Sequence, residues 1–435
     1  MTTGSSFQEP GTRNNVMSLS RAAILAVGSE LLTPLRIDTN SLHITERLNT
    51  LGIDVVFKAV IGDSRDELSH AVRETIGRVD LLVLSGGLGP TDDDVTREAV
   101  ADVLARPMRE DPAITERIRQ RFESRGWTMP EINRRQAMVP EGAEVLANPN
   151  GTAPGLWIEH ERGLVVLLPG PPRELQPMLS DVIDRRLRAR CGTTTLRRRL
   201  IRITGRTESH TDEALRHLYL EWNEAVPSIS ATILAALGQI ELHLSGRSDA
   251  GDTIEAALDR AVAQVQRVLG LDAYSTDGRS LEEVVGDLLA ARGLWIAAAE
   301  SCTGGLITSR LTDVPGSSRY VDRSVVTYSD ASKTALLGVP KDLIAVHGAV
   351  SEAVAEAMAD GVRRSAGVDV GIGVTGIAGP GGGTAEKPVG MVCIAAVIQD
   401  ARRVRTARFI GGREQVKFQA SQAALDMVRR MLLEP

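Results

Sequence analysis

The chain alternates short apolar runs with segments whose apolar residues recur at helical spacing. Near the start, residues 22–27, 55–60 and 81–84 have the length and composition of buried strands, and residues 42–51 and 67–76 have the spacing of helices. Strands that alternate with helices imply a parallel sheet with helices on both faces. Ligands of such sheets bind outside the carboxyl ends of the strands. The first part of the chain is therefore predicted to be an α/β layer domain with a site at that edge.

A second alternation of the same kind begins at residue 275 and runs to residue 435. Its predicted strands are residues 294–298, 325–328, 368–374, 389–397 and 403–410, and its predicted helices are residues 281–292, 306–311, 351–364 and 414–433. This pattern predicts a second α/β layer domain.

Between the two lies a smaller segment, residues 198–272, whose order is strand, helix, strand, helix. We expect a small α+β module here that acts as a connector or dimerisation unit. The predicted organisation is thus a disordered tail at residues 1–20 and two α/β domains, at residues 21–190 and 275–435, joined by that module.

Seven arginines between residues 181 and 199 mark the boundary before the module. An arginine-rich patch can bind nucleic acid, but it can also be a solvated helix face followed by a linker. The net charge of −6 favours the second interpretation. Over the whole chain most basic residues are arginines. Only five are lysines: Lys58, Lys333, Lys341, Lys387 and Lys417.

The three cysteines, Cys191, Cys302 and Cys393, are too few and too scattered for a disulfide framework or a closed zinc site. A reducing cytoplasm is the simplest setting for such a chain. No apolar run approaches the roughly 20 residues that a membrane span needs, and residues 1–20 lack the apolar core of a signal peptide.

A glycine-rich loop follows the predicted strand at residues 81–84. Gly86, Gly87 and Gly89 would let the backbone approach a ligand closely, and Asp93 and Asp94 follow just before a predicted helix at residues 95–104. Glycine amides suit a phosphate and carboxylates suit a hard divalent cation, so the loop can hold a metal-bridged phosphate ester. The aspartates can also simply complement the helix start. A later loop, residues 169–174, either lines the same crevice or is a plain Pro/Gly loop.

The heptapeptide at residues 299–305 joins a predicted strand to a predicted helix. It places Ser301, Cys302 and Thr303 in the turn, with Gly304 and Gly305 behind them. A nucleophile there would have backbone N–H groups within reach to stabilise an oxyanion. The alternative is a capped helix start whose glycines permit a tight turn.

Taken in order, these motifs resemble those of the CinA family, the competence/damage-inducible proteins, over nearly the whole chain after residue 20. In the N-terminal unit the matches are Gly28, Glu30, Leu31, Leu32, Asp38, Thr39, Asn40, Gly62, Asp63, Gly86, Gly87, Leu88, Gly89, Pro90, Thr91, Asp93, Asp94, Thr96, Asn133, Gln136, Ala137, residues 151–155 and residues 168–170. In the C-terminal unit they are residues 299–305, Thr327, Tyr328, Ser329, Lys333, residues 337–339, residues 348–351, residues 375–380 and residues 388–390.

The N-terminal unit resembles the family's molybdopterin-binding-like domain, which is related to the MoaB/MogA fold. The C-terminal unit is similar to nicotinamide mononucleotide (NMN) deamidase of the PncC type, and the middle module stands where the family has a small KH-like domain. Four positions depart from the family pattern, all around the N-terminal site: Ser29, Pro34, Pro171 and Leu175.

For the C-terminal unit the resemblance implies hydrolysis of NMN to nicotinate mononucleotide and ammonia, without a cofactor. Ser301 would attack the amide carbon and needs a base. No histidine lies in the motifs, so Lys333 is the expected base and Tyr328 its proton relay or orienter. Cys302 is the rival nucleophile, since a thiolate needs less activation. The remaining expected substrate contacts are Glu300, the oxyanion donors Thr303, Gly304 and Gly305, and a loop at residues 375–383 that holds ribose and phosphate through Thr375, Gly376 and Gly379.

For the N-terminal unit the resemblance implies an ADP-ribose pyrophosphatase that uses a divalent metal ion. Asp93 and Asp94 would bind the metal, and the expected substrate contacts are Gly86, Gly87, Gly89, Thr91 and Asn40. Two other classes of protein stay open: a non-enzymatic nucleotide-binding regulator linked to competence or DNA damage, and a molybdopterin-handling protein. The modular build suggests a homodimer, and no strong nucleic-acid signal is present.

Overall fold

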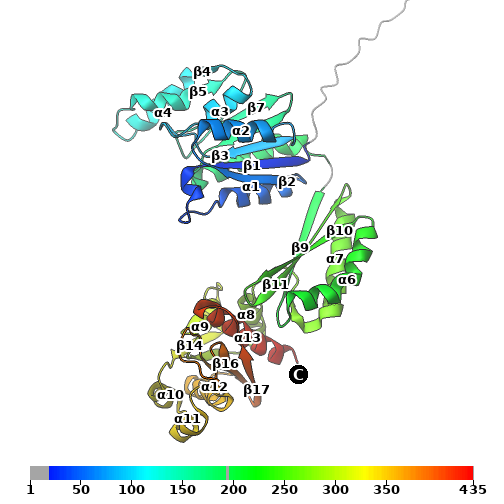
Figure 1. Cartoon of the computed structure of the whole chain (residues 1–435), viewed down its shortest axis with the longest axis vertical. Coiled ribbons are helices and arrows are strands. Elements are labelled where there is room, and N and C mark those ends of the chain that lie inside the picture. Colours follow the sequence, from blue (N-terminus) through cyan, green and yellow to red (C-terminus); the bar gives the residue numbers. More distant parts are fainter. Residues whose placement is uncertain (1–18, 193–194, 435) are drawn as a thin grey trace, which may run out of the picture. The chain divides into compact units, whose positions relative to one another are not determined.

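The computed structural model describes residues 19–192 and 195–434, which divide into two compact units. The first unit contains the described residues up to Arg197 together with residues 247–253. The second contains residues 198–246 and 254–434. Figure 1 colours the chain by sequence, so the first unit runs from blue to green and the second from green to red.

The first unit is built on a six-stranded sheet of mixed direction. Its order is β2 (Asp54–Ile61), β1 (Arg21–Val27), β3 (Leu81–Ser85), β8 (Gly163–Leu168), β7 (Gly155–His160) and β6 (Glu144–Leu146). The first four strands run parallel, as predicted, while β7 and β6 are antiparallel to them. Because β1, β3 and β8 are parallel, the loops that follow them lie at one edge of the sheet.

Helices cover both faces of this sheet (Figure 1). Apolar side chains of α1 (Asn40–Asn49) and α5 (Pro172–Val182) pack on one face, and those of α2 (Arg65–Thr75) and α3 (Thr96–Val103) pack on the other. Helix α5 begins at Pro172, inside the segment predicted as a loop, because proline is well suited to the first turn of a helix. The region between α3 and β6 also holds elements that the sequence pattern did not reveal: β4 (Met108–Glu110), α4 (Pro112–Glu123) and β5 (Met138–Pro140).

The prediction that residues 1–20 form a disordered tail is wrong for residues 19 and 20. Residues 1–18 lie outside the described residues, but Leu19 is buried and its amide donates to the carbonyl of Arg190. The Ser20 amide and hydroxyl both donate to Asp80. The ordered domain therefore begins by residue 19.

The arginine-rich segment is mostly ion-paired. At least five of its seven arginines make ion pairs: Arg185 with Asp181, Arg186 with Glu144, Arg188 with Asp184, Arg190 with Glu159, and Arg199 with Glu255 and Asp259. This supports the interpretation as a solvated, paired surface over a nucleic-acid patch.

In the second unit the sheet of the middle module has four strands where the sequence predicted two. Its sheet has the order β10 (Ile229–Ala236), β11 (Gln239–Ser248), β9 (Thr195–Ile203) and β12 (Ala273–Ser275), and it carries α6 (Glu208–Glu224) and α7 (Gly251–Leu269). Strand β10 escaped prediction because its residues are largely exposed and include three alanines, which give no clear apolar alternation.

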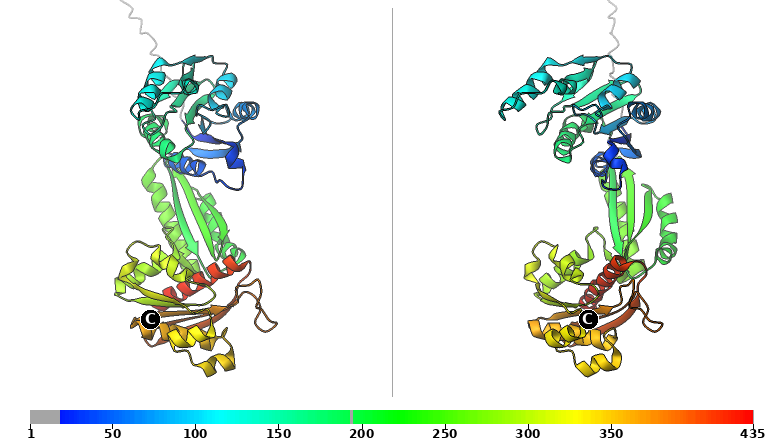
Figure 2. Two further views of the ribbon diagram at one scale, coloured as in Figure 1. Left: turned by 90° about the vertical axis from the view of Figure 1, so that its left-hand side faces the viewer. Right: turned by 60° about the vertical axis from the view of Figure 1, so that its left-hand side comes forward.

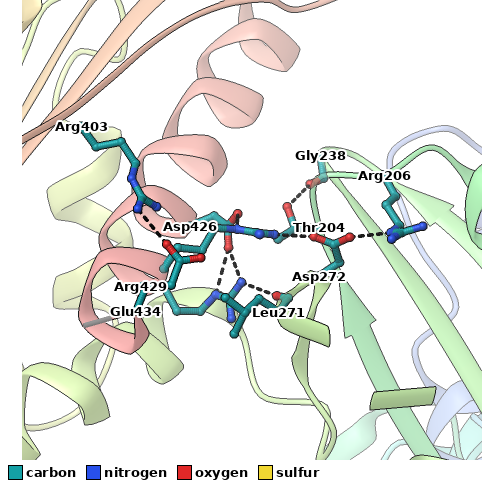
Figure 3. Close-up of polar contacts among 10 residues, drawn as sticks. Thr204, Arg206, Gly238, Leu271, Asp272, Arg403, Asp426, Arg429 and Glu434 are labelled. Carbon is teal, nitrogen blue, oxygen red and sulfur yellow. Dashed lines mark hydrogen bonds and ion pairs between the residues drawn. The ribbon is translucent and has the colours of Figure 1, made fainter. Parts of the chain in front are cut away.

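The module is joined to the last helix of the chain, α13 (Arg413–Leu433), by a polar network (Figure 3). The Arg429 guanidinium donates to the carbonyl of Leu271 at 2.5 Å, and Arg430 forms an ion pair with Asp272 at 2.6 Å. Asp426 accepts from both arginines, which places all four charges in one connected set. The module and the last domain thus belong to one compact unit.

The last domain is a five-stranded sheet between two layers of helices. Its order is β14 (Val321–Val326), β13 (Ile296–Glu300), β15 (Val370–Gly376), β16 (Met391–Ile398) and β17 (Ala401–Arg408), and only the first three strands are parallel. Helix α12 (Glu352–Ala366) packs on one face, and α8 (Leu281–Arg292), α9 (Leu306–Thr312) and α13 pack on the other (Figure 2). The α/β fold class is confirmed for both large domains.

Two short helices here were not predicted, α10 (Asp330–Leu337) and α11 (Lys341–His347). Strand β14 also ends at Val326, two residues earlier than expected, so Tyr328 lies in the loop that leads into α10. Among the described residues, none of the helices combines the length and the apolar character that crossing a bilayer requires.

Candidate functional site

Ser301 and Lys333 form a buried pair at the carboxyl end of β13. The Ser301 amide donates to the carbonyl of Val374 on the neighbouring strand β15, which fixes the turn. Helix α10 brings Lys333 to the same place, where its Nζ lies 3.4 Å from Ser301 Oγ and 3.0 Å from the carbonyl oxygen of Thr327. The first separation is at the long end of hydrogen bonding, as is common in active sites without substrate. A hydroxyl and an amine thus lie side by side, an arrangement that can supply a nucleophile and a base.

Burial lowers the pKa of the Lys333 amine, as a proton acceptor requires. Lys333 is 1% exposed, and burial lowers the pKa of its amine below the ordinary lysine value, while nearby Asp330 acts in the opposite direction. A lowered pKa increases the fraction of neutral amine, which is the form that accepts a proton.

Cys302, the rival nucleophile, is directed away from Ser301. Its side chain is buried in the apolar core that α8, α9 and α13 form on one face of the sheet. Burial raises the pKa of this thiol to about 12, so the reactive thiolate is scarce at neutral pH. The geometry therefore favours Ser301.

Glu300 was expected to contact the substrate, but the structure turns its carboxylate toward the protein backbone. Its carboxylate is fully buried and accepts from the amides of Gly305, Ile307 and Thr308 at 3.0 to 3.1 Å, and from the Thr308 hydroxyl at 3.1 Å. It therefore holds the start of α9 and the turn that carries Ser301, and its acceptor oxygens face the protein.

Two of the three expected oxyanion donors, the amides of Gly304 and Gly305, are already engaged within the protein. The amide of Gly304 donates to the carbonyl of Ser301, and the amide of Gly305 is taken by Glu300. Of the three predicted donors, Thr303 alone has an amide that neither a backbone carbonyl nor a carboxylate takes within the described residues, although this amide faces the Cys302 thiol. The buried hydroxyls of Thr303 and Thr327 also lack a partner among the described residues.

Tyr328 does not orient Lys333. Its side chain is 62% exposed, and its hydroxyl accepts from Arg413 at 2.7 Å, while the carbonyl of Thr327 takes the orienting role. Arg413, at the start of α13, also donates to the carbonyl of Gly379 at 3.0 Å. Sequence analysis missed Arg413 because it lies about 110 residues beyond Ser301, and its only signal was a charged residue directly after Gly411 and Gly412.

The loop at residues 375–383 has mainly internal contacts. The Thr375 hydroxyl donates to the carbonyl of Ala349 at 2.8 Å. A Cβ on Gly376 would lie 2.8 Å from the Met391 carbonyl, so this glycine is required by close strand packing. Gly379 presents its carbonyl to Arg413. The expected binding of ribose and phosphate by this loop stays a prediction.

In the first unit, the predicted edge of the sheet carries a cavity of about 370 Å³. The glycines predicted as substrate contacts, Gly86, Gly87 and Gly89, line it. Five carboxylates line it as well: Glu30, Asp63, Asp93, Asp94 and Glu174. Such a surface would repel a phosphate that carries no metal ion. Its carboxylate oxygens are the ligands that a hard divalent cation prefers. No group of three or more His, Cys, Asp or Glu residues among those described is already arranged around one metal position.

The glycine loop is held from behind by the first turn of α3. The Thr96 hydroxyl and amide donate to the carbonyls of Gly86 and Gly87, and the buried Arg97 guanidinium donates to the next two, of Leu88 and Gly89. Four successive carbonyls thus turn toward the helix. Within the described residues, the amides of Gly87 and Leu88 have no hydrogen-bond partner and remain available to an anion.

Three other predicted contacts are engaged within the protein. Asp94 accepts from the Gly89 amide at 2.7 Å and from Thr91, whose amide and hydroxyl both donate to it. The Asn40 side chain donates to the carbonyl of Gly170 at 2.7 Å. Neither Asn40 nor Thr91 lines the cavity, whereas Asp93 is exposed and does. Of the two predicted metal ligands, Asp93 is therefore the one whose carboxylate remains exposed to the cavity.

Comparison with known proteins matches each half of the chain to a family model and the whole chain to full-length relatives. Residues 278–432 match the CinA C-terminal domain, and residues 23–189 match a family described as "Probable molybdopterin binding domain". A CinA-like protein of Koribacter versatilis is 45% identical over 416 residues, 95% of this chain and 100% of the relative, and one of Acidobacterium capsulatum is 42% identical over 424 residues with the same coverage. The crystal structure of a competence/damage inducible protein of Agrobacterium tumefaciens, 37% identical, covers 36% of this chain and 98% of its own, with a TM-score of 0.34. On the strength of the full-length identities, this chain belongs to the CinA family.

Proposed function

We propose that the C-terminal site hydrolyses the carboxamide of NMN to nicotinate mononucleotide and ammonia. The observation that carries the proposal is the buried pair of Ser301 Oγ and Lys333 Nζ at 3.4 Å, with the lysine pKa lowered by burial. A serine needs such a base, and a Ser–Lys pair is a known solution to that need.

The reaction proceeds in two halves. Ser301 Oγ adds to the amide carbon as its proton passes to Lys333 Nζ, and the tetrahedral intermediate expels ammonia when Lys333 returns that proton to the departing nitrogen. Water then adds to the resulting ester, with Lys333 again taking the proton, and the carboxylate leaves as the Ser301 hydroxyl reforms. Of the predicted donors to the oxyanion, Thr303 is favoured because its amide is not taken by a backbone carbonyl or by Glu300; this role is worth about 3–4 kcal/mol in well-studied enzymes.

Incubation of the full chain with NMN, with ammonia measured, tests this function. We expect Ser301→Ala to abolish ammonia release and Cys302→Ala to retain it. Tight binding of NMN without turnover by the unaltered chain would support the non-enzymatic regulator instead.

We propose a second activity for the first unit, the metal-dependent hydrolysis of ADP-ribose at its diphosphate. The carboxylate-lined cavity beside the free amides of Gly87 and Leu88 supports it, because a divalent ion held by Asp93 would neutralise a diphosphate that those amides receive. The bound ion would polarise a phosphoryl oxygen.

Release of AMP from ADP-ribose in the presence of Mg²⁺ or Mn²⁺, and its loss with a chelator, is the expected result. Binding of molybdopterin with no hydrolysis of ADP-ribose would favour the molybdopterin-handling alternative. The homodimer and the cytoplasmic location stay predictions, and sedimentation of the full chain tests the first of them.

A further inference from the structure

We propose that Lys417 binds the phosphate of the nucleotide substrate at the C-terminal site, together with Arg413, and so selects nucleotides over nucleosides. The inference rests on the proposed deamidase function and assigns a role to a residue outside every motif that the sequence analysis singled out.

Position is the first argument. Lys417 follows Arg413 by four residues on α13, so the two side chains project from one face of the helix. A Cβ built on Gly304 would lie 3.6 Å from Lys417 Nζ, which places this ammonium beside the turn that carries Ser301. Arg413 reaches the same site from one helical turn earlier, through Tyr328 and the carbonyl of Gly379.

Charge is the second argument. Lys417 makes no ion pair or hydrogen bond with any residue that the structure describes. Two other lysines of this domain are engaged, since Lys387 donates to the carbonyls of His347 and Val350, and Lys333 donates to that of Thr327. Lys417 is half-buried, where an unpaired cation gains more from a partner of opposite sign than it would in bulk water.

The third argument is that no carboxylate among the described residues pairs with Lys417 at this turn. Glu300, the nearest carboxylate in sequence to the turn, is satisfied by the amides of Gly305, Ile307 and Thr308. Those amides are in turn occupied, so the start of α9 has nothing left to offer an anion. Lys417 and Arg413 are described cations beside this turn for which no carboxylate partner is found, and lysine binds phosphate as a point charge.

Kinetics of Lys417→Gln with two substrates test the assignment. NMN carries the phosphate and nicotinamide riboside lacks it. We expect the variant to lower the ratio of kcat/KM for NMN to kcat/KM for the riboside by about 10- to 100-fold, the worth of one hydrogen-bonded charge, mainly through the KM for NMN. Lys341→Gln, which removes an exposed lysine of α11 in the same domain, is the matched control and should leave the ratio unchanged.

An equal loss on both substrates, or an unchanged ratio, would overturn the inference. If the unaltered chain releases no ammonia from NMN, the deamidase function fails, and equilibrium dialysis with NMN then decides the role of Lys417 separately. The assignment holds only if Lys417→Gln weakens NMN binding by a similar factor and Lys341→Gln does not.

Discussion

Glu300 offers a sharp test of how the active-site turn is held. The resemblance predicted a substrate contact, whereas the structure shows a buried carboxylate that accepts from the amides of Gly305, Ile307 and Thr308 and from the Thr308 hydroxyl. One carboxylate oxygen serves Gly305 and Ile307, and the other serves both groups of Thr308. Glu300→Gln keeps the shape but replaces one of these oxygens with an NH2 group, which cannot accept.

The free energy that the turn loses in Glu300→Gln follows from the number of hydrogen bonds that the new side chain cannot accept. At least one hydrogen bond to a charged group is lost, because the Thr308 hydroxyl can turn to accept from the new NH2 group but the Thr308 amide cannot. Such a bond is worth about 1.5–3 kcal/mol, so the turn should be destabilised by at least about that amount. Since 1.4 kcal/mol is a factor of ten, the amides of residues 304–308 should exchange with solvent at least about tenfold faster. Hydrogen exchange followed by mass spectrometry of the peptide spanning this turn measures the change.

Ser324→Ala is a suitable comparison, because the Ser324 hydroxyl is a weaker partner of Glu300 at 3.4 Å and its loss leaves the amide contacts intact. Ser324→Ala should leave the hydrogen-exchange rates of the amides in the turn nearly unchanged. If Glu300→Gln left exchange in the turn unchanged and only raised the KM for NMN, Glu300 would be a substrate contact and the structural account would be refuted.

Three further predictions concern both sites. Because neutral Lys333 is the base and burial lowers its pKa, kcat/KM for NMN should rise with pH, with its midpoint below 10.5; a midpoint at or above that value would contradict the role of burial. Because the pKa of Cys302 is about 12, its alkylation by iodoacetamide at pH 7.5 should be slow in the folded chain and fast after unfolding, and fast labelling of native protein would show an accessible thiolate. Asp93→Asn should raise the metal concentration needed for ADP-ribose hydrolysis about tenfold with stability unchanged within about 0.5 kcal/mol, whereas Asp94→Ala should destabilise the glycine loop by about 2–4 kcal/mol; the reverse pattern in metal titrations and urea unfolding would exchange their roles.

The elements that the sequence predicted well are those whose burial matches their composition. Helix α8 has the predicted bounds because Ser280 and Gly293 cap it at its two ends. Strand β13 begins two residues later than predicted, since Trp295 is apolar but 40% exposed. Composition alone does not reveal such exposure.

The pairing of Ser301 with Lys333 was also within reach of sequence reasoning, because a serine without histidine needs another base. What the sequence could not reveal is how polar groups divide among partners at short range. Glu300 folds back onto the amides that were expected to hold an oxyanion, and Tyr328 contacts Arg413, about 85 residues away. Both contacts depend on three-dimensional packing of α9 and α13, which no local pattern encodes.

The covalent intermediate tests the central claim most directly. The full chain is mixed with NMN, quenched in acid within the first turnover, digested, and examined by peptide mass spectrometry for a nicotinate mononucleotide acyl group. The account predicts this group as an ester on Ser301 that disappears in Ser301→Ala and persists in Cys302→Ala. An adduct on Cys302, or continued ammonia release by Ser301→Ala, would contradict it.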